Sequence, residues 1–150
     1  MRVTLSLVAI LVFAVPGLGS PPTRDPKLES RAREYFGSLA AGDFARLWDM
    51  SSVSVRGDMG NDRDAFVERM SQMAAYDLNF TLAACCSDES EGWLFLEIRI
   101  RQTKAHDWDV RNYEARWVRE GDEWFLESLV DVASFNWALS FCDRIPASPN

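Results

Sequence analysis

Few side chains in this sequence can do acid–base, nucleophilic or metal chemistry near neutral pH. The 150 residues include one histidine, His106, and three cysteines, Cys85, Cys86 and Cys142. His106 lies in the polar stretch 104–109, which predicts a turn between strands and therefore a solvated imidazole. The spacing of these four residues matches no zinc-ligand or transition-metal set and no cysteine–histidine nucleophile pair. We therefore predict no metal site and no cofactor.

The charge balance of the chain is acidic. Lys and Arg number 16 against 23 Asp and Glu, so the formal net charge is -7. A nucleic-acid-binding protein needs a positive surface to displace counterions from phosphates, so we predict no nucleic-acid partner. Aromatic residues make up 12% of the chain, with six Trp. Together with a length typical of one domain, this composition predicts a single aromatic-rich globular domain.

The N-terminal residues have the pattern of an export signal. Arg2 precedes an apolar run at 5–15, which a proline and several small residues follow. This order is typical of a secretory signal peptide, and the run is shorter than the roughly 20 apolar residues of a membrane span. We expect a signal peptide at 1–19, a stiff linker at 20–26, and a secreted protein, periplasmic or extracellular, with no membrane association after cleavage. Loss of Arg2 leaves 15 basic and 23 acidic residues, a net charge of -8.

An oxidising compartment favours a disulfide between two of the three cysteines. Cys85 and Cys86 are adjacent in sequence and are poorly placed to bond each other. We predict that Cys142 pairs with one of them, and the sequence leaves both pairings open. Cys86 shares the apolar phase of Leu82 and Ala84, which predicts a buried structural position for it.

Three helices are expected in the N-terminal half. Asp25, which a proline follows, is typical of an N-cap, and the apolar residues after it recur at helical spacing until Gly42. Asp43 starts a second, short helix. Asp62 or Asp64 starts a third.

Two shorter segments complete the expected domain. Val53 and Val55 predict a brief strand, and residues 57–61 predict a loop. We place one domain at 27–145 and a frayed tail at 146–150.

The second half of the chain has the period of β-strands. From Asp77 onward apolar and polar residues alternate, with polar turns expected at 87–92, 104–109 and 120–123. Each strand then has one apolar face, which the helices must cover, so we predict an α+β fold. The positions expected to point inward are Leu94, Leu96, Ile98, Ile100, Tyr113, Ala115, Trp117, Trp124, Leu126, Ser128 and Val130. None of them is a carboxylic acid.

Three stretches resemble the nuclear transport factor 2-like superfamily, which includes ketosteroid isomerases, polyketide cyclases and many binding domains. They are 35–48, with its Tyr-Phe, Ala-Gly-Asp-Phe and Leu-Trp, 63–66 at the start of the third helix, and 117–124 around the last hairpin. The resemblance extends over residues 28–130. It implies a cystatin-like cone with an open mouth, in which three N-terminal helices pack on the concave face of a curved antiparallel sheet.

The resemblance also implies a place for chemistry. Tyr35 precedes Gly42 and Asp43 by the spacing at which ketosteroid isomerases place their oxyanion-stabilising tyrosine, and Asp58 falls within one residue of their general base. A base beside the substrate carbon and a donor at the developing enolate would suffice to shuttle a proton. The sequence departs from that family pattern because the predicted inward positions supply no second acid.

The absence of inward carboxylates favours binding over catalysis, while the aromatic residues either fill the core or line a cavity. Within the implied cone, a flat or apolar ligand would contact Trp48, Tyr113, Trp117, Trp124 and Ser128. We therefore expect a secreted, non-catalytic domain, monomeric or homodimeric, that binds a small apolar ligand or a partner protein. One alternative is an isomerase-, cyclase- or dehydratase-like enzyme that uses Tyr35 and Asp58. Another is a structural accessory domain with a filled cone and an interaction surface at Trp93 and Phe125.

Overall fold

The computed structural model describes residues 23–72, 76–102, 106–134 and 142–144. The predicted signal peptide and the C-terminal tail lie outside the described residues. Four helices come first: α1 (Pro26–Ala41), α2 (Phe44–Asp49), α3 (Val53–Asp58) and α4 (Arg63–Ser71). The strands follow: β1 (Asp77–Ser87), β2 (Glu91–Arg101), β3 (Asp109–Glu120), β4 (Glu123–Val132) and β5 (Asp143–Arg144).

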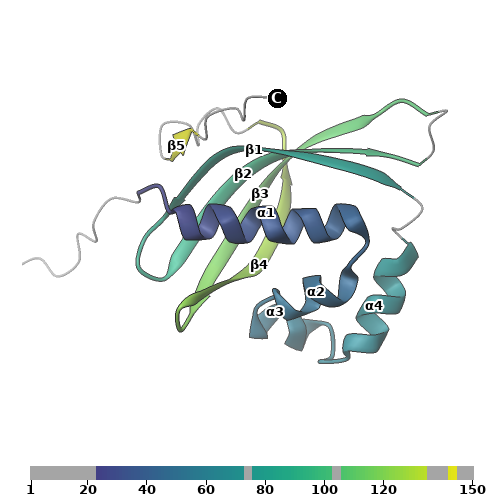
Figure 1. Cartoon of the computed structure of the whole chain (residues 1–150), viewed down its shortest axis with the longest axis horizontal. Coiled ribbons are helices and arrows are strands. Elements are labelled where there is room, and N and C mark those ends of the chain that lie inside the picture. Colours follow the sequence, from purple (N-terminus) through teal and green to yellow (C-terminus); the bar gives the residue numbers. More distant parts are fainter. Residues whose placement is uncertain (1–22, 73–75, 103–105, 135–141, 145–150) are drawn as a thin grey trace, which may run out of the picture.

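The strands form one curved antiparallel sheet in the order β4-β3-β2-β1-β5 (Figure 1). Helix α1 lies across one face of this sheet, and α2, α3 and α4 gather near one end of α1 (Figure 1). We call the side that α1 covers the inner face and the other side the outer face. The fold is therefore α+β, as predicted. No helix in the described ranges is long and apolar enough to cross a membrane.

The helices begin and end where their terminal residues satisfy free backbone groups. The Asp25 carboxylate accepts hydrogen bonds from two backbone N–H groups of the first turn of α1, at 2.8 and 3.1 Å. Gly42 ends α1 with φ 74°, a conformation that costs glycine little. Asp43 and Asp62 cap α2 and α4 in the same way as Asp25 caps α1. These predicted caps are confirmed.

The brief strand expected at Val53 and Val55 is wrong, because this segment is the helix α3. The Ser52 hydroxyl accepts from the Val55 N–H at 3.1 Å and so starts the helix. The backbone does contact the sheet just before α3, where the Ser52 N–H donates to the Leu126 carbonyl of β4 at 2.9 Å. Four described helices therefore precede β1, where the sequence analysis expected three.

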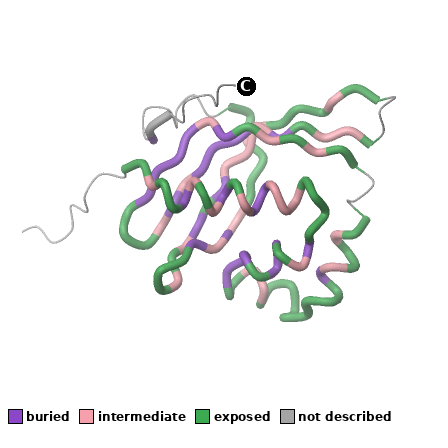
Figure 2. Tube along the Cα trace, in the orientation of Figure 1, coloured by how far each residue is buried: buried purple, intermediate pink, exposed green. Residues whose placement is uncertain are grey.

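The main core lies between α1, α2 and the inner face of the sheet (Figure 2). Trp117, Phe36 and Leu28 are among its fully buried side chains. Helix α1 packs so closely on β2 that a Cβ atom at Gly92 would lie 2.4 Å from Leu28 Cδ2. Glycine at this position therefore leaves room for the buried Leu28 side chain.

A β-bulge in β1 reverses the predicted orientation of Cys86. The register shifts between Leu82 and Ala84, so that Cys85 lies opposite Leu94 on the inner face. Cys86 then points to the outer face, as Ala84 does. Because side chains alternate along a strand, one extra residue moves every later side chain to the other face. Cys86 is buried as expected, but in a second cluster on the outer face.

A second bulge, in β4, overturns two predicted inward positions. Trp117 lies opposite Leu126, but Arg116 lies opposite Ser128, so that Glu127 is the extra residue. From there onward the alternation is reversed. Ser128 and Val130 face outward, and Val130 is 53% exposed.

Candidate functional site

Tyr35 is part of the packed core. Its residue is 8% exposed, and its ring meets those of Phe36 and Trp117 edge to face, with centroid distances of 5.3 and 5.7 Å. Burial raises the pKa of the Tyr35 hydroxyl to about 12, and the nearby Ser51 hydroxyl opposes that shift. The phenol is therefore a neutral hydrogen-bonding group at physiological pH.

Asp58 lies in a different environment from Tyr35. It is the last residue of α3 and is exposed to solvent. A general base must reach the reacting proton inside the same sheltered site as the oxyanion donor. The structure does not bring Tyr35 and Asp58 into such a site.

Three of the aromatic residues predicted to line a ligand cavity are core residues. Trp117 is fully buried, Trp124 is 3% exposed and Trp48 is 7% exposed. The Trp48 ring packs on Phe66 with a centroid distance of 5.4 Å. The Trp124 indole donates to the Asp25 carboxylate at 3.2 Å. These rings pack against protein side chains, as the filled-interior alternative expects.

Trp117 carries an unsatisfied polar atom. Among the buried side-chain nitrogen and oxygen atoms of the described ranges, its Nε1 is the one without a hydrogen-bond partner. Such a donor costs about 1–3 kcal/mol relative to a satisfied one. No local pattern in the sequence indicates it, because the partner of a buried indole depends on tertiary packing.

Tyr113 is half-buried on the inner face, next to three charged residues, Asp109, Arg111 and Asp131. The Arg111 guanidinium donates to Asp109 at 2.9 Å and to Asp131 at 3.3 Å. Asp131 lies opposite Tyr113, because the bulge in β4 turned it inward. Burial and the Asp131 charge both raise the pKa of Tyr113. The expectation of an inner face without carboxylates is therefore wrong near Tyr113, where the side chains of Asp109, Arg111 and Asp131 are about half-exposed.

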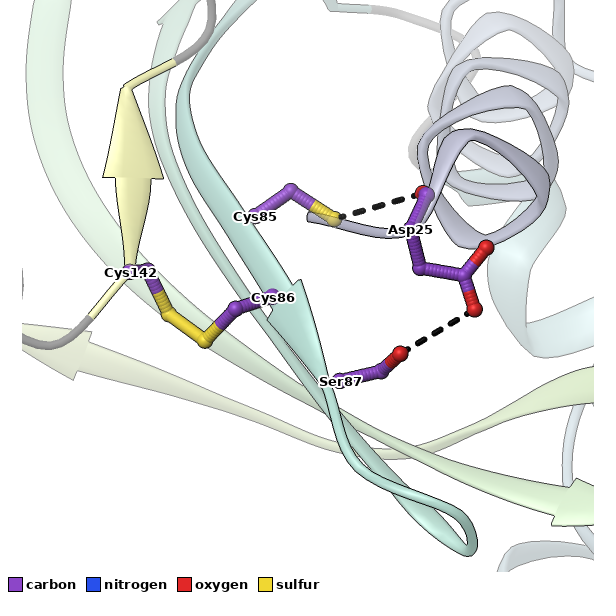
Figure 3. Close-up of a disulfide and its surroundings, with 5 residues drawn as sticks. All are labelled: Asp25, Cys85, Cys86, Ser87 and Cys142. Atoms are coloured by element: carbon purple, nitrogen blue, oxygen red, sulfur yellow. Dashed lines mark hydrogen bonds between the residues drawn. A yellow bond between two sulfur atoms is a disulfide. The ribbon is translucent and has the colours of Figure 1, made fainter. Parts of the chain in front are cut away.

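The disulfide joins Cys86 to Cys142, with Cα atoms 5.1 Å apart. Figure 3 shows Cys86 and Cys85 pointing to opposite sides of β1. Cys85 is a buried free thiol that faces α1, and its Sγ lies 4.0 Å from the Asp25 carbonyl. Burial and nearby carboxylates raise the pKa of this thiol to about 12, so it is a poor nucleophile. Of the two pairings left open by the sequence, the structure has the one with Cys86.

The outer-face aromatics expected to form an interaction surface are partly covered. Trp93 packs against the cluster of Ala84, Cys86, Phe95 and Cys142, in which Phe95 is fully buried. Phe125 is half-buried, with the Arg31 guanidinium carbon 5.7 Å from its ring centroid. His106 is exposed, and no three metal-ligating side chains gather within the ranges that the structure describes.

A groove that the sequence did not predict lies where α1 ends and β1 begins. Its volume is about 470 Å³, and it is lined by Ala40, Tyr76, Asp77, Leu78, Asn79, Arg101 and Trp108. We call it the Trp108 groove. Arg101 Nε donates to the Asp77 carboxylate at 2.9 Å, and the guanidinium carbon lies 4.3 Å from the centroid of the Trp108 ring. The available signal was a large aromatic residue in a polar turn, which core packing does not require.

Comparisons with known proteins identify a fold and no family. No protein-family model matches the chain, and no curated protein matches it. A SEC-C motif-containing protein from Rhodopseudomonas palustris has a similar structure, with a TM-score of 0.57 and 16% identity over 69% of this chain and 77% of its own. A Xanthomonas campestris protein described as a calcium/calmodulin-dependent protein kinase II association domain has a TM-score of 0.52 and 10% identity, over 78% and 96% of the two chains. At these identities the likeness extends to the fold alone.

Proposed function

We propose that this chain is a secreted, non-catalytic binding domain of the nuclear transport factor 2-like type, and that it holds its partner at the surface. In this proposal α1, α2 and α4 correspond to the three helices of the cone, and α3 is an added turn. The order of helices followed by a curved antiparallel sheet supports it, as do the motifs at 35–48 and 117–124. The fold likeness to the Xanthomonas protein, over 96% of that chain, agrees with it.

The packing of Tyr35 against Trp117 is the observation that carries this proposal. A ligand inside the cone would have to displace rings that already pack edge to face, one of them fully buried. An acid–base pair would need Asp58, which is exposed on α3. Both considerations favour a ligand or partner on the surface, and the proposal includes no cofactor or metal.

Secretion is supported by the cysteines as well as by the N-terminal sequence. Disulfides persist in oxidising compartments and are rare in reducing ones. The bond between Cys86 and Cys142 holds the C-terminal segment to β1. An exported protein would form this bond on folding.

Expression of the full chain in a host with a secretory pathway tests the export step. Intact-mass analysis of the exported protein should give a chain that begins at Ser20 and contains one disulfide. A variant without residues 1–19 is the control and should remain in the cytoplasm. Retention of the full-length chain in the cytoplasm, unprocessed, would overturn the secretion proposal.

A titration followed by tryptophan fluorescence tests where binding occurs. Flat apolar probes such as pyrene should produce no saturable change in the native mature protein, since the interior is packed. The Asp58→Asn variant should behave like the wild type. A saturable response that Tyr35→Phe removes would show that the interior is a ligand site and would contradict surface binding.

A further inference from the structure

We propose that the Trp108 groove binds a neutral carbohydrate. This inference rests on the proposed function and names the ligand class of a surface site. It is carried by the combination of aromatic rings with planar polar side chains in one hollow.

The aromatic part of the groove suits the apolar face of a sugar ring. Tyr76 is 37% exposed, and Trp108 lines the hollow from the segment before β3. Ring C–H groups of a pyranose present a flat apolar face, and an aromatic ring offers a matching flat surface. Tyr76 is exposed beside the hollow, while Trp108 is half-buried and has the Arg101 guanidinium against one side of its ring, so a sugar would contact the Tyr76 ring and the remaining surface of Trp108.

The polar part of the groove offers donors and acceptors in fixed positions. Arg101 is held by the Asp77 carboxylate and by the Trp108 ring, and its side chain is 23% exposed. The ion pair occupies Nε, while the terminal nitrogens of a guanidinium carry four further N–H donors. Asn79 adds an exposed amide, which is both donor and acceptor. Neighbouring sugar hydroxyls, which donate and accept together, are matched by planar groups of this kind.

The charges of the groove favour a neutral ligand. The Asp77 carboxylate offsets the Arg101 cation at 2.9 Å, so the pair presents little net charge. The whole chain has a net charge of -7, which repels phosphates and other anions at long range. A volume of about 470 Å³ lies within the range of small-molecule sites, which is roughly 300–1,000 Å³.

An extended peptide is the competing occupant. Over Asp77–Asn79, β1 has β2 on one side and no second strand beside it in the described ranges, whereas β5 pairs with Ala84 and Cys85. A peptide added at this edge would bond mainly to the backbone, so its affinity would depend less on the side chains of Asn79 and Trp108 than that of a sugar. The aromatic and polar side chains that line the hollow are explained by a sugar and not by backbone pairing.

Calorimetric titration of the mature, disulfide-bonded protein tests the proposal. The probes are short cello-, chito-, malto- and xylo-oligosaccharides, and the matching insoluble polysaccharides separate a free sugar from a matrix chain. One sugar class should bind saturably, and Trp108→Ala should weaken binding at least about tenfold. Asn79→Ala, an exposed substitution that leaves folding intact, should also weaken it. Phe125→Ala, outside the groove, should leave the affinity unchanged.

Three outcomes would overturn the proposal. They are no binding of any sugar class at millimolar concentration, sugar binding that neither Trp108→Ala nor Asn79→Ala weakens, and capture of an extended peptide or of inorganic phosphate at the groove in place of sugar. If the chain is exported and the apolar probes do not bind in its interior, each of these outcomes refutes carbohydrate binding but not the proposed surface binding. Cytoplasmic retention or an occupied interior would instead remove the proposed function.

Discussion

Asp25 joins the start of α1 to two strands. One carboxylate oxygen, Oδ1, caps the helix, while Oδ2 accepts from the Ser87 hydroxyl at 3.0 Å and from the Trp124 indole at 3.2 Å (Figure 3 shows the Ser87 bond). The sequence predicts the capping role because a cap depends on neighbouring residues. The contacts with Ser87 and Trp124 span 62 and 99 residues and have no local signal.

Replacement of Asp25 should therefore cost more than the loss of a cap. We expect Asp25→Ala to lower the free energy of unfolding by about 2–4 kcal/mol, since a cap contributes about 1 kcal/mol and two donors lose their acceptor. Urea unfolding measures this change. Asp62→Ala is the matched control, because Asp62 caps α4 and should cost about 1 kcal/mol. Equal losses in the two variants would contradict the bridging role.

The two buried indoles give a second comparison at single residues. Trp124→Phe removes a donor that has an acceptor, while Trp117→Phe removes a donor that has none. Both variants lose similar ring volume, so Trp124→Phe should destabilise by about 1 kcal/mol more than Trp117→Phe. Urea unfolding of both variants at one pH checks this. A larger loss at Trp117 would mean that its Nε1 has a partner in solution, such as a buried water.

Alkaline pH should weaken the fold through Tyr35 and Cys85. Their ordinary pKa values are 10.0 and 9.0, and burial raises both to about 12. The folded state holds each proton more tightly than the unfolded state, so the stability is full below pH 9 and falls as the pH rises toward 12. Each unit between folded and unfolded pKa corresponds to about 1.4 kcal/mol. Unfolding curves at several pH values from 7 to 11 should show this fall, and Cys85→Ala should make the slope between pH 9 and 10 shallower. An identical slope in Cys85→Ala would contradict the assignment.

At the scale of elements, the sequence predicts what neighbouring residues decide. The ends of α1 and the turn around Gly121 follow from capping and turn residues, and both agree with the structure. The predicted phase of β1 is right as far as Leu82 and that of β4 as far as Leu126. The rest of each of these two strands has the opposite phase, because a bulge follows at both places. A bulge adds one residue to one strand, and the pairing partner that reveals it is remote in sequence. For this reason Asp131 faces inward and Ser128 faces outward, opposite to the orientations that simple alternation predicts.

The bulge in β4 also fixes α3. Glu127 accepts from the Ser52 hydroxyl, which is 1% exposed and caps α3. Glu127→Ala should lower the free energy of unfolding by about 1–3 kcal/mol, because a buried hydroxyl loses its acceptor. Glu127→Gln should cost less, since an amide oxygen can accept the same bond. Glu114→Ala on β3 is the control and should change stability by about 0.5 kcal/mol or less. A similar loss in Glu114→Ala would show that Glu127 acts through general charge and not through Ser52.

At the scale of the whole molecule, the sheet carries apolar clusters on both faces. The inner cluster packs against the helices, and the outer one is formed by Ala84, Cys86, Phe95 and Cys142, with Trp93 against it. Strands β4 and β5 lie at opposite edges of the sheet. The sequence predicted a cystine at Cys142, but the outer cluster followed from the bulge in β1 and had no local signal.

The disulfide should therefore stabilise the fold and keep the outer cluster covered. A Cys86→Ala, Cys142→Ala double variant should lose about 2–4 kcal/mol, because the bond closes a loop across 56 residues of the unfolded chain. Its native state should show a red-shifted tryptophan emission, since Trp93 gains water when Cys142 no longer anchors the C-terminal segment. Urea unfolding and emission spectra of the native proteins measure the two effects separately. Cys85→Ala is the control for loss of a buried sulfur, and it should destabilise the protein without a red shift, because Cys85 faces α1. A double variant that loses stability but keeps the wild-type emission would show that strand pairing at β5 holds the segment without the bond. The covering role would then belong to the two β5 residues opposite Ala84 and Cys85.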